Sequence, residues 1–254
     1  MLRTVRVLAE NGPVRVEIAR LGGASGRLVV VKRLVAFHPT LERRLAREAE
    51  VVAKLQHPGI LPLLETRAGA LVYPFVPAPT LAAVLRGGPL PAPRVVHFAA
   101  ALLAALADAH AHGVVHHDVK PDNVLVRGDR ALLTDFGFAK DLGSAAITGA
   151  DTALGTPHYM APEQFDGARG DPRSDLYALT ATLYHAAVGT PPWGADALRV
   201  AAGGADLPLD PPPGDAAPLA PWFARGLARD PADRWPDADA MRAALPGYGR
   251  EVAA

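Results

Sequence analysis

Side chains that can carry chemistry are concentrated in the stretch His116-His117-Asp118-Val119-Lys120-Pro121-Asp122-Asn123. The whole chain has four lysines and two asparagines, so one of each in eight residues is not surface filler. Apolar residues 124–126 follow, and a second acidic motif, Asp135-Phe136-Gly137, comes soon after. The pattern predicts one site built from two neighbouring loops.

These side chains suit phosphoryl transfer from a metal-bound nucleotide. That chemistry needs hard oxygen ligands for Mg²⁺, a carboxylate to accept the proton of an attacking hydroxyl, and ammonium groups to offset phosphate charge. We predict Asp118 as the base, Lys120 as the contact to the γ-phosphate, and Asn123 and Asp135 as the metal ligands. The alternative is that Asp118, Asn123 and Asp135 only form turns. Turn formation does not explain why these three residues occur together.

With these residues the chain resembles the eukaryotic-type (Hanks-type) serine/threonine protein kinases, above all their bacterial members. The resemblance extends from about Thr4 to Leu245 and rests on seven motifs in the family's order. They are Val29-Val30-Val31-Lys32, Arg47-Glu48-Ala49, His116 to Asn123, Asp135-Phe136-Gly137, Gly155 to Glu163, Ser174-Asp175-Leu176-Tyr177 and Asp230 to Arg234. One motif alone arises by chance, whereas seven in order are specific.

The resemblance implies further roles. Lys32 would bind the nucleotide and pair with Glu48, although Glu42 and Glu50 are nearby alternatives for that pairing. Asp175 would support the catalytic loop.

At the far end of the chain, Arg234 would pair with Glu163. Lys120, two positions after Asp118, is typical of the serine/threonine branch. The expected acceptors are therefore Ser and Thr hydroxyls of proteins, with ATP as the donor and Mg²⁺, or Mn²⁺ in its place, as the metal.

The implied fold is α+β and two-lobed, a single protein kinase domain over residues 1–254. Its N-lobe, about 1–73, would hold a five-stranded antiparallel sheet and the helix αC. A hinge, about 74–79, would lead to a mainly helical C-lobe, about 80–254. The sequence pattern agrees, because apolar residues alternate over 4–31 and are interrupted by turn residues at 11–13 and 22–26.

Other elements follow from apolar spacing and turn signals. A helix is expected from Thr40 to Leu55, ending at Gln56-His57-Pro58-Gly59, and strands at Ile60–Leu64 and Ala70–Val76. Further helices are expected at Arg94–His112, Asp175–Val188, Ala217–Leu227 and Asp237–Leu245.

The nucleotide site is expected at two places in the first third of the chain. If residues 71–76 form the hinge, Tyr73 is the gatekeeper, and adenine bonds to the carbonyl of Pro74 and the N–H of Val76. Proline is acceptable there because only its carbonyl is needed.

The phosphate loop is expected at residues 9–16, where Asn11, Gly12 and Val16 are the predicted nucleotide contacts. The family's three glycines would fall at Ala9, Asn11 and Val14, and none is kept. Val14 should crowd the loop and Pro13 removes an N–H, which predicts a weak grip on ATP. Asn11-Gly12 still favours a tight hairpin turn.

A second departure is His117, where most family members have an arginine that meets a phosphorylated activation loop. This puts phosphate-dependent activation in doubt. Ser144, Thr148 and Thr152 lie in the expected activation loop as phosphorylation candidates.

Composition excludes several classes of protein. With 254 residues, 26 basic and 26 acidic side chains and no cysteine, the chain lacks the charge of a nucleic-acid binder and cannot form disulfides. The first ten residues do not resemble a signal peptide. The longest uncharged run, Leu176–Ala195, contains Gly189, Pro191 and Pro192 and is interpreted as a buried helix, not a membrane span. We expect a cytoplasmic protein, with a regulatory protein in trans as a further partner.

Three alternatives stay open. A pseudokinase scaffold with little or no phosphotransfer is favoured by the eroded phosphate loop. A small-molecule kinase is disfavoured by the complete motif from Gly155 to Glu163. A metal site of His110, His112, His116 and His117 is disfavoured because no zinc motif accompanies them.

Overall fold

The computed structural model describes residues 2–23, 25–36, 39–136, 157–165, 170–201, 203 and 207–247. The chain divides into two compact units, residues 1–77 and residues 78–254. The boundary falls within residues 74–79, where the sequence places the hinge.

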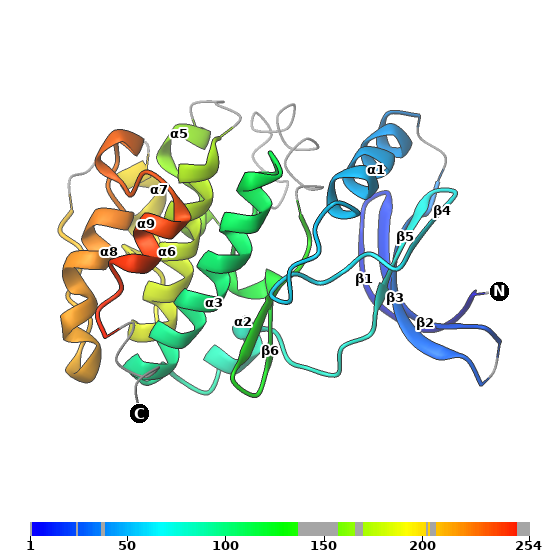
Figure 1. The fold of residues 1–254 in the computed structure, drawn as a ribbon, viewed down its shortest axis with the longest axis horizontal. Helices are drawn as coiled ribbons and strands as arrows, with labels where there is room; N and C mark the ends of the chain where they lie inside the picture. Colours follow the sequence, from blue (N-terminus) through cyan, green and yellow to red (C-terminus); the bar gives the residue numbers. More distant parts are fainter. Residues whose placement is uncertain are drawn as a thin grey trace. The chain divides into compact units, whose positions relative to one another are not determined.

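The first unit contains a five-stranded antiparallel sheet (Figure 1). Its strands are β1 (Leu2–Asn11), β2 (Val14–Leu21), β3 (Arg27–Leu34), β4 (Glu65–Arg67) and β5 (Ala70–Pro74), in the order β1-β2-β3-β5-β4. The two-residue turn Gly12-Pro13 joins β1 to β2, and Gly12 has the positive φ of 58° that such a turn favours. The predicted meander is confirmed.

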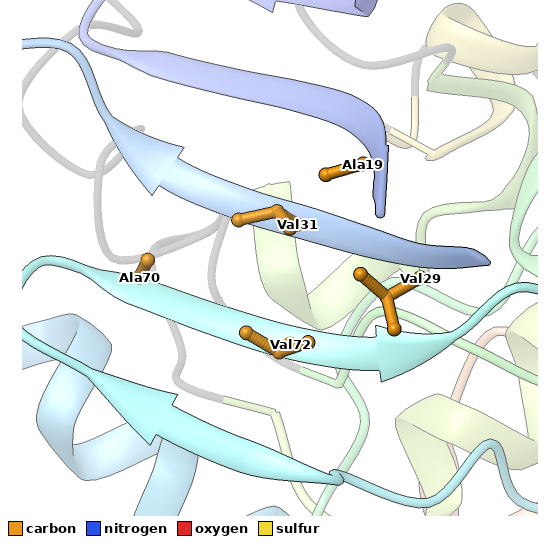
Figure 2. Close-up of a cluster of buried hydrophobic side chains, with 5 residues drawn as sticks. All are labelled: Ala19, Val29, Val31, Ala70 and Val72. Carbon is orange, nitrogen blue, oxygen red and sulfur yellow. The ribbon is translucent and has the colours of Figure 1, made fainter. Parts of the chain in front are cut away.

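One face of this sheet carries a buried apolar cluster, Ala19, Val29, Val31, Ala70 and Val72 (Figure 2). Val31 is paired with Val72 of β5 and with Glu17 of β2, and paired residues share a face. Because side chains alternate along a strand, Lys32 lies on the opposite face from Val31. The apolar pattern therefore fixes the direction in which Lys32 points.

Helix α1 (Pro39–Val52) is the helix of the first unit. Its buried residues, Leu41, Leu45, Ala49 and Val52, recur every three or four positions. The observed end lies three residues before the predicted one.

The predicted strand Ile60–Leu64 is wrong, because β4 begins at Glu65. Pro62 has no N–H to donate, and the Ile60 N–H is used in a turn to His57. Leu64 is the first residue to join the ladder, through its N–H to Val72.

In its described residues, the second unit is mainly helical and contains one small hairpin (Figure 1). Its helices are α2 (Leu81–Leu85), α3 (Ala92–Ala111), α5 (Pro162–Phe165), α6 (Pro172–Val188), α7 (Ala197–Ala201), α8 (Ala220–Gly226) and α9 (Ala238–Ala243). Short 3₁₀ turns are η1 (Pro121–Asn123), η2 (Pro157–Tyr159), η3 (Gly194–Asp196), η4 (Gly214–Leu219) and η5 (Pro231–Asp233). The hairpin pairs β6 (Val124–Arg127) with β7 (Arg130–Leu133).

Helix α6 is the buried helix expected from the uncharged run. Asp171 and Ser174 form a capping box at its start, and Gly189 ends it with a φ of 93°. Burial all round the helix explains why its sequence lacks an amphipathic pattern.

Among the described residues, one helix, α3, is long and apolar enough to cross a membrane. Half of its most apolar window is buried in the structure, including Phe98, Leu102 and Leu106. Helices α6 and α9 contact it. A core helix passes the same test of length and composition, so this feature is weak evidence for a membrane span.

Candidate active site

In the first unit, Lys32 of β3 donates to Glu48 of α1. Its Nζ lies 3.0 Å from Oε1 and 3.3 Å from Oε2, and both residues are 7% exposed. The Tyr73 hydroxyl, from β5, lies 3.4 Å from the same Oε1. The predicted pairing is thus confirmed for Glu48, whereas Glu50 is exposed.

The remaining predicted nucleotide contacts lie on the sheet and just beyond it. Val16 is paired with Lys32 across β2 and β3, so both are on one face. Pro74 ends β5 opposite Val29, and Val76 follows without regular structure. Asn11 and Gly12 lie at the tip of the β1–β2 hairpin. No contact tests their predicted roles in binding ATP.

The expected phosphate loop is this tight hairpin, in which Asn11 is paired with Val14. Across its two strands Glu10 and Arg15 form an exposed ion pair of 2.9 Å. The Pro13 carbonyl accepts the N–H of Val35 at 2.9 Å. The tip is therefore closed by protein contacts.

The second unit brings Asp118, Lys120 and Asn123 together. Lys120 Nζ lies 2.8 Å from Asp118 Oδ2, and Asn123 Nδ2 lies 2.9 Å from the same oxygen. The Asn123 amide also donates to the Asp118 carbonyl at 2.8 Å. These bonds fix the carboxylate in one orientation, with a cation and an amide beside it.

Buried Asp175, at the start of α6, supports this loop by binding its backbone N–H groups. Its two oxygens accept the N–H groups of His116 and His117, each at 2.7 Å, and Oδ2 accepts from His110 Nε2 at 2.9 Å. His117 has a φ of 65°, the left-handed conformation that turns its N–H toward the carboxylate. The predicted support by Asp175 is confirmed.

Burial raises the pKa of Asp175, but the hydrogen bond from His110, the charges of His116 and His110 and the His116 N–H together outweigh it. The net pKa is lower than that of a free aspartate. Asp175 is therefore an anion at neutral pH, as its accepted hydrogen bonds require.

His116 connects the two motifs. Its Nε2 lies 2.9 Å from the Thr134 carbonyl, which can only accept, and its Nδ1 lies 3.3 Å from the Asp118 N–H, which can only donate. In this geometry Nε2 donates to the Thr134 carbonyl and Nδ1 accepts from the Asp118 N–H. Phe136 packs against it, with ring centroids 4.4 Å apart.

The β6–β7 hairpin brings Asn123 next to Asp135. Val124 is paired with Leu133, so Asn123 and Thr134 come next on the two strands. The Thr134 N–H and hydroxyl both donate to the Asn123 carbonyl, at 2.9 and 3.2 Å. Asp135 follows at once, with a φ of 60°. Two predicted metal ligands thus start from adjacent backbone positions.

These two residues fit a hard cation such as Mg²⁺. The Asn123 Nδ2 is engaged with Asp118, which leaves the amide oxygen as the ligand atom. Asp135 is exposed and supplies a carboxylate. An amide oxygen and a carboxylate are the donors that Mg²⁺ prefers.

Comparison with known proteins now decides the family. A family model described as "Protein kinase domain" matches residues 20–202. The chain belongs to the protein kinase family. The serine/threonine-protein kinase PknE of Mycobacterium tuberculosis is 36% identical over 222 residues, which are 82% of this chain and 39% of PknE.

Other relatives of this kinase domain are also bacterial. The DNA damage-responsive serine/threonine-protein kinase RqkA of Deinococcus radiodurans is 41% identical over 205 residues, 75% of this chain and 30% of RqkA. The kinase domain thus spans well under half the length of these curated relatives. The predicted family, a bacterial Hanks-type serine/threonine kinase, is confirmed.

The fold class is confirmed as well. The PknI kinase domain of M. tuberculosis superposes with a TM-score of 0.71 and 30% identity, covering 96% of this chain and 94% of that chain. Proteins of this family generally use ATP and Mg²⁺.

Some predictions for the kinase domain fall outside the described residues. These are Gly137, Gly155, Thr156 and the phosphorylation candidates Ser144, Thr148 and Thr152. The segment that follows them is described from Pro157, and its Glu163 pairs with Arg234 as predicted.

The four histidines considered above as metal ligands, His110, His112, His116 and His117, all lie in the described part of the chain and do not form a metal site. Within the described part of the chain, no three His, Cys, Asp or Glu side chains are placed to hold an ion. His110 contacts Asp175, His116 contacts Thr134, and His112 contacts its own helix at Asp108. The disfavoured interpretation is therefore wrong.

Two contacts of the kinase domain were missed by sequence reasoning. Tyr73 was expected as a gatekeeper but not as a partner of Glu48, and Tyr159 bonds to His185. Neither pair follows a local pattern, since 25 and 26 residues separate the partners. Only the chain's path in space connects them.

Proposed function

We propose that this kinase domain is catalytically active and transfers the γ-phosphoryl group of Mg·ATP to Ser and Thr hydroxyls of proteins. The observation that carries the proposal is the constellation on one oxygen, Asp118 Oδ2, which accepts from Lys120 at 2.8 Å and from Asn123 at 2.9 Å. A turn-forming aspartate would not need either partner.

The residues of the catalytic loop have distinct roles in the step. Asp118 orients the acceptor hydroxyl and takes its proton as the oxygen bonds to the γ-phosphorus, while the bond from that phosphorus to the bridging oxygen breaks and ADP leaves. Lys120 exchanges its contact with Asp118 for one with the γ-phosphoryl oxygens. Each role follows from a side chain already fixed in the loop.

Lys32 binds phosphate oxygens and is kept extended by Glu48, whose two carboxylate oxygens it contacts. Asn123 and Asp135 would hold Mg²⁺, which offsets negative charge on the phosphates when bound. In this proposal the adenine is contacted by Tyr73, Pro74 and Val76. The further nucleotide contacts are Asn11, Gly12 and Val16.

The closed hairpin at Gly12-Pro13 favours a second candidate, a pseudokinase scaffold. Pro13 lies in a tip that should present backbone N–H groups to phosphates, and the Glu10–Arg15 ion pair joins the two strands next to it. We propose that this hairpin lowers the affinity for ATP. Catalysis is retained in this proposal because the catalytic loop is complete.

Intact-mass spectrometry tests the proposal. The purified chain is incubated with Mg·ATP and dephosphorylated casein, beside the variants Asp118→Asn and Asp129→Asn. Asp129 is an exposed aspartate in the β6–β7 turn and serves as the matched control. Phosphate added by the wild type and by Asp129→Asn, but not by Asp118→Asn, supports the proposal. Equal phosphate with Asp118→Asn, or none with the wild type, overturns it.

Substrate identity, a regulatory protein in trans and a cytoplasmic location stay predictions. The family implies protein substrates in general.

A further inference from the structure

The hydroxyl of Tyr159 lies 2.7 Å from His185 Nδ1. Tyr159 belongs to η2, and His185 lies near the end of α6. Their rings are nearly parallel, with an interplanar angle of 11° and centroids 6.1 Å apart. The contact therefore attaches η2 to the central helix of the second unit in a defined geometry.

Burial raises the pKa of the Tyr159 phenol far above its ordinary value, helped by the negative charge of Asp122. The phenol thus keeps its hydrogen at every physiological pH and has it to donate. His185 Nδ1 can accept this hydrogen when the ring is neutral with its own hydrogen on Nε2.

The surroundings of His185 favour the neutral ring. Burial lowers the pKa of His185, a backbone hydrogen bond at Gly189 raises it, the charge of His158 lowers it and that of Asp122 raises it, and the net direction is down. These groups come from η2, from η1 and from the turn after α6. Trp193, which is not titratable, packs partly buried against the cluster that contains Tyr159.

Protonation would change this contact in kind. A doubly protonated imidazole has two donors and no acceptor, so the Tyr159 hydroxyl must turn its hydrogen elsewhere. Tyr159 is 7% exposed, and a buried donor without an acceptor is destabilising. The attachment of η2 to α6 is thus sensitive to one proton.

Two further contacts of the segment 157–165 do not change charge near neutral pH. Ala161 is fully buried among Tyr177, Ala181 and Leu227. Burial raises the pKa of Glu163, but hydrogen bonds from Arg234 and Ser174 outweigh it and lower the net value, so this carboxylate stays charged. The contact to His185 differs from these two because a proton can change it.

We propose that His185 is a positioning residue, which acts through Tyr159 to place η2 for the protein substrate, and that protonation of His185 weakens substrate binding. The proposal rests on the proposed function and on the family resemblance, which implies that the segment ending in Ala161-Pro162-Glu163 receives the protein substrate. His185 does not touch the reacting atoms. It determines whether the receiving segment is held in place.

The test uses the full chain with Mg·ATP and dephosphorylated casein between pH 5.5 and 8. Two variants are compared with the wild type. His185→Gln keeps an amide oxygen that can accept from Tyr159 but cannot be protonated. Tyr159→Phe keeps the ring and removes the hydroxyl. The KM for casein, the KM for ATP and kcat are measured at each pH. They are compared between the proteins and, within each protein, with its value at pH 8.

In the wild type the KM for casein is expected to rise roughly 5-fold to 10-fold toward pH 5.5, the size of one lost hydrogen bond, with little change in the KM for ATP. In His185→Gln this rise is absent. In Tyr159→Phe the KM for casein is raised at all pH values and does not depend further on His185. A rise that persists in His185→Gln, or a flat wild type, overturns the proposal.

Thermal unfolding without ATP separates this proposal from the proposed function. His185 has a lower pKa in the folded chain than when unfolded, so the wild type should lose stability as the pH falls below about 6.5. His185→Gln should lack that part of the loss. This measurement remains decisive if neither the wild type nor a variant phosphorylates casein. Equal pH dependence of the melting temperature in the wild type and in His185→Gln would then overturn the proposed role of the Tyr159–His185 contact.

Discussion

The Arg234 guanidinium binds both carboxylate oxygens of Glu163, with Nη1–Oε1 and Nη2–Oε2 distances of 2.8 and 2.7 Å. Its remaining hydrogens go to the carbonyls of Ala228, Arg173 and Arg229. Arg234 is 2% exposed and lies over the Tyr177 ring. It therefore connects the segment after η2 with α6 and the turn before η5.

Replacing Arg234 should destabilise the second unit. Arg234→Lys cannot make the two parallel bonds and leaves carbonyls without donors, so we expect a loss of about 3 kcal/mol in the free energy of unfolding. Urea titration followed by circular dichroism measures it. The control is Arg199→Lys, at an exposed pair with Asp196, where the change should stay below about 0.5 kcal/mol. Similar losses in both variants would contradict this assignment.

Asp175→Asn should damage both stability and catalysis. An amide presents one NH₂ group, so one of the N–H groups of His116 and His117 must face a donor, which costs about 1–3 kcal/mol. The loop carrying Asp118 should then lose its fixed orientation. Thermal unfolding and casein phosphorylation measure the two effects, and an unchanged melting temperature would count against the role of Asp175.

The stability of the protein at acid pH should depend on the Asp175 carboxylate. The pKa of Asp175 is lower in the folded chain than in the unfolded chain, so its stabilisation is present above the unfolded value of about 3.9 and is lost as the pH falls through the folded value. Asp175→Asn should show a shallower loss of stability below about pH 4. Equal acid profiles for wild type and variant would be the contrary result.

Glu48→Gln should lower kcat/KM by about 10-fold or more, because Lys32 loses the charge that orients it. Glu50→Gln, two positions along α1 and exposed, is the matched control and should change kcat/KM by less than twofold, about the error of such comparisons. Initial rates at varied ATP concentration measure both. A larger loss of kcat/KM in Glu50→Gln than in Glu48→Gln would show that Glu48 is not the functional partner of Lys32.

Gly226→Ala should destabilise the packing of α8 on α6. A Cβ at this position would meet the Thr180 hydroxyl and lie 2.8 Å from Thr180 Cγ2, and Thr180 is fully buried. We expect a loss of about 1–3 kcal/mol from this overpacking. Thr180→Ser removes the methyl group and should partly rescue Gly226→Ala in a double-mutant cycle measured by urea unfolding. Additive effects would show that the two sites are independent.

Much of the fold is predictable from local pattern. Alternating apolar residues and the Asn11-Gly12-Pro13 turn determine the meander of the first unit, and Gly189 with Pro191 ends α6 where expected. The strand at Ile60–Leu64 was misplaced because short apolar runs do not distinguish a strand from an irregular buried segment. Pro62 was the signal against it.

The amino-acid sequence predicts the chemistry of this protein, because the motifs that contain its carboxylates, lysines and amide occur in the order of the kinase family. Packing in the folded chain added contacts that the motifs do not imply. The Tyr73–Glu48 and Tyr159–His185 contacts join residues 25 and 26 positions apart. Such contacts depend on how the sheet, the helices and the turns pack in the folded chain. The local spacing of residues in the sequence does not specify this packing.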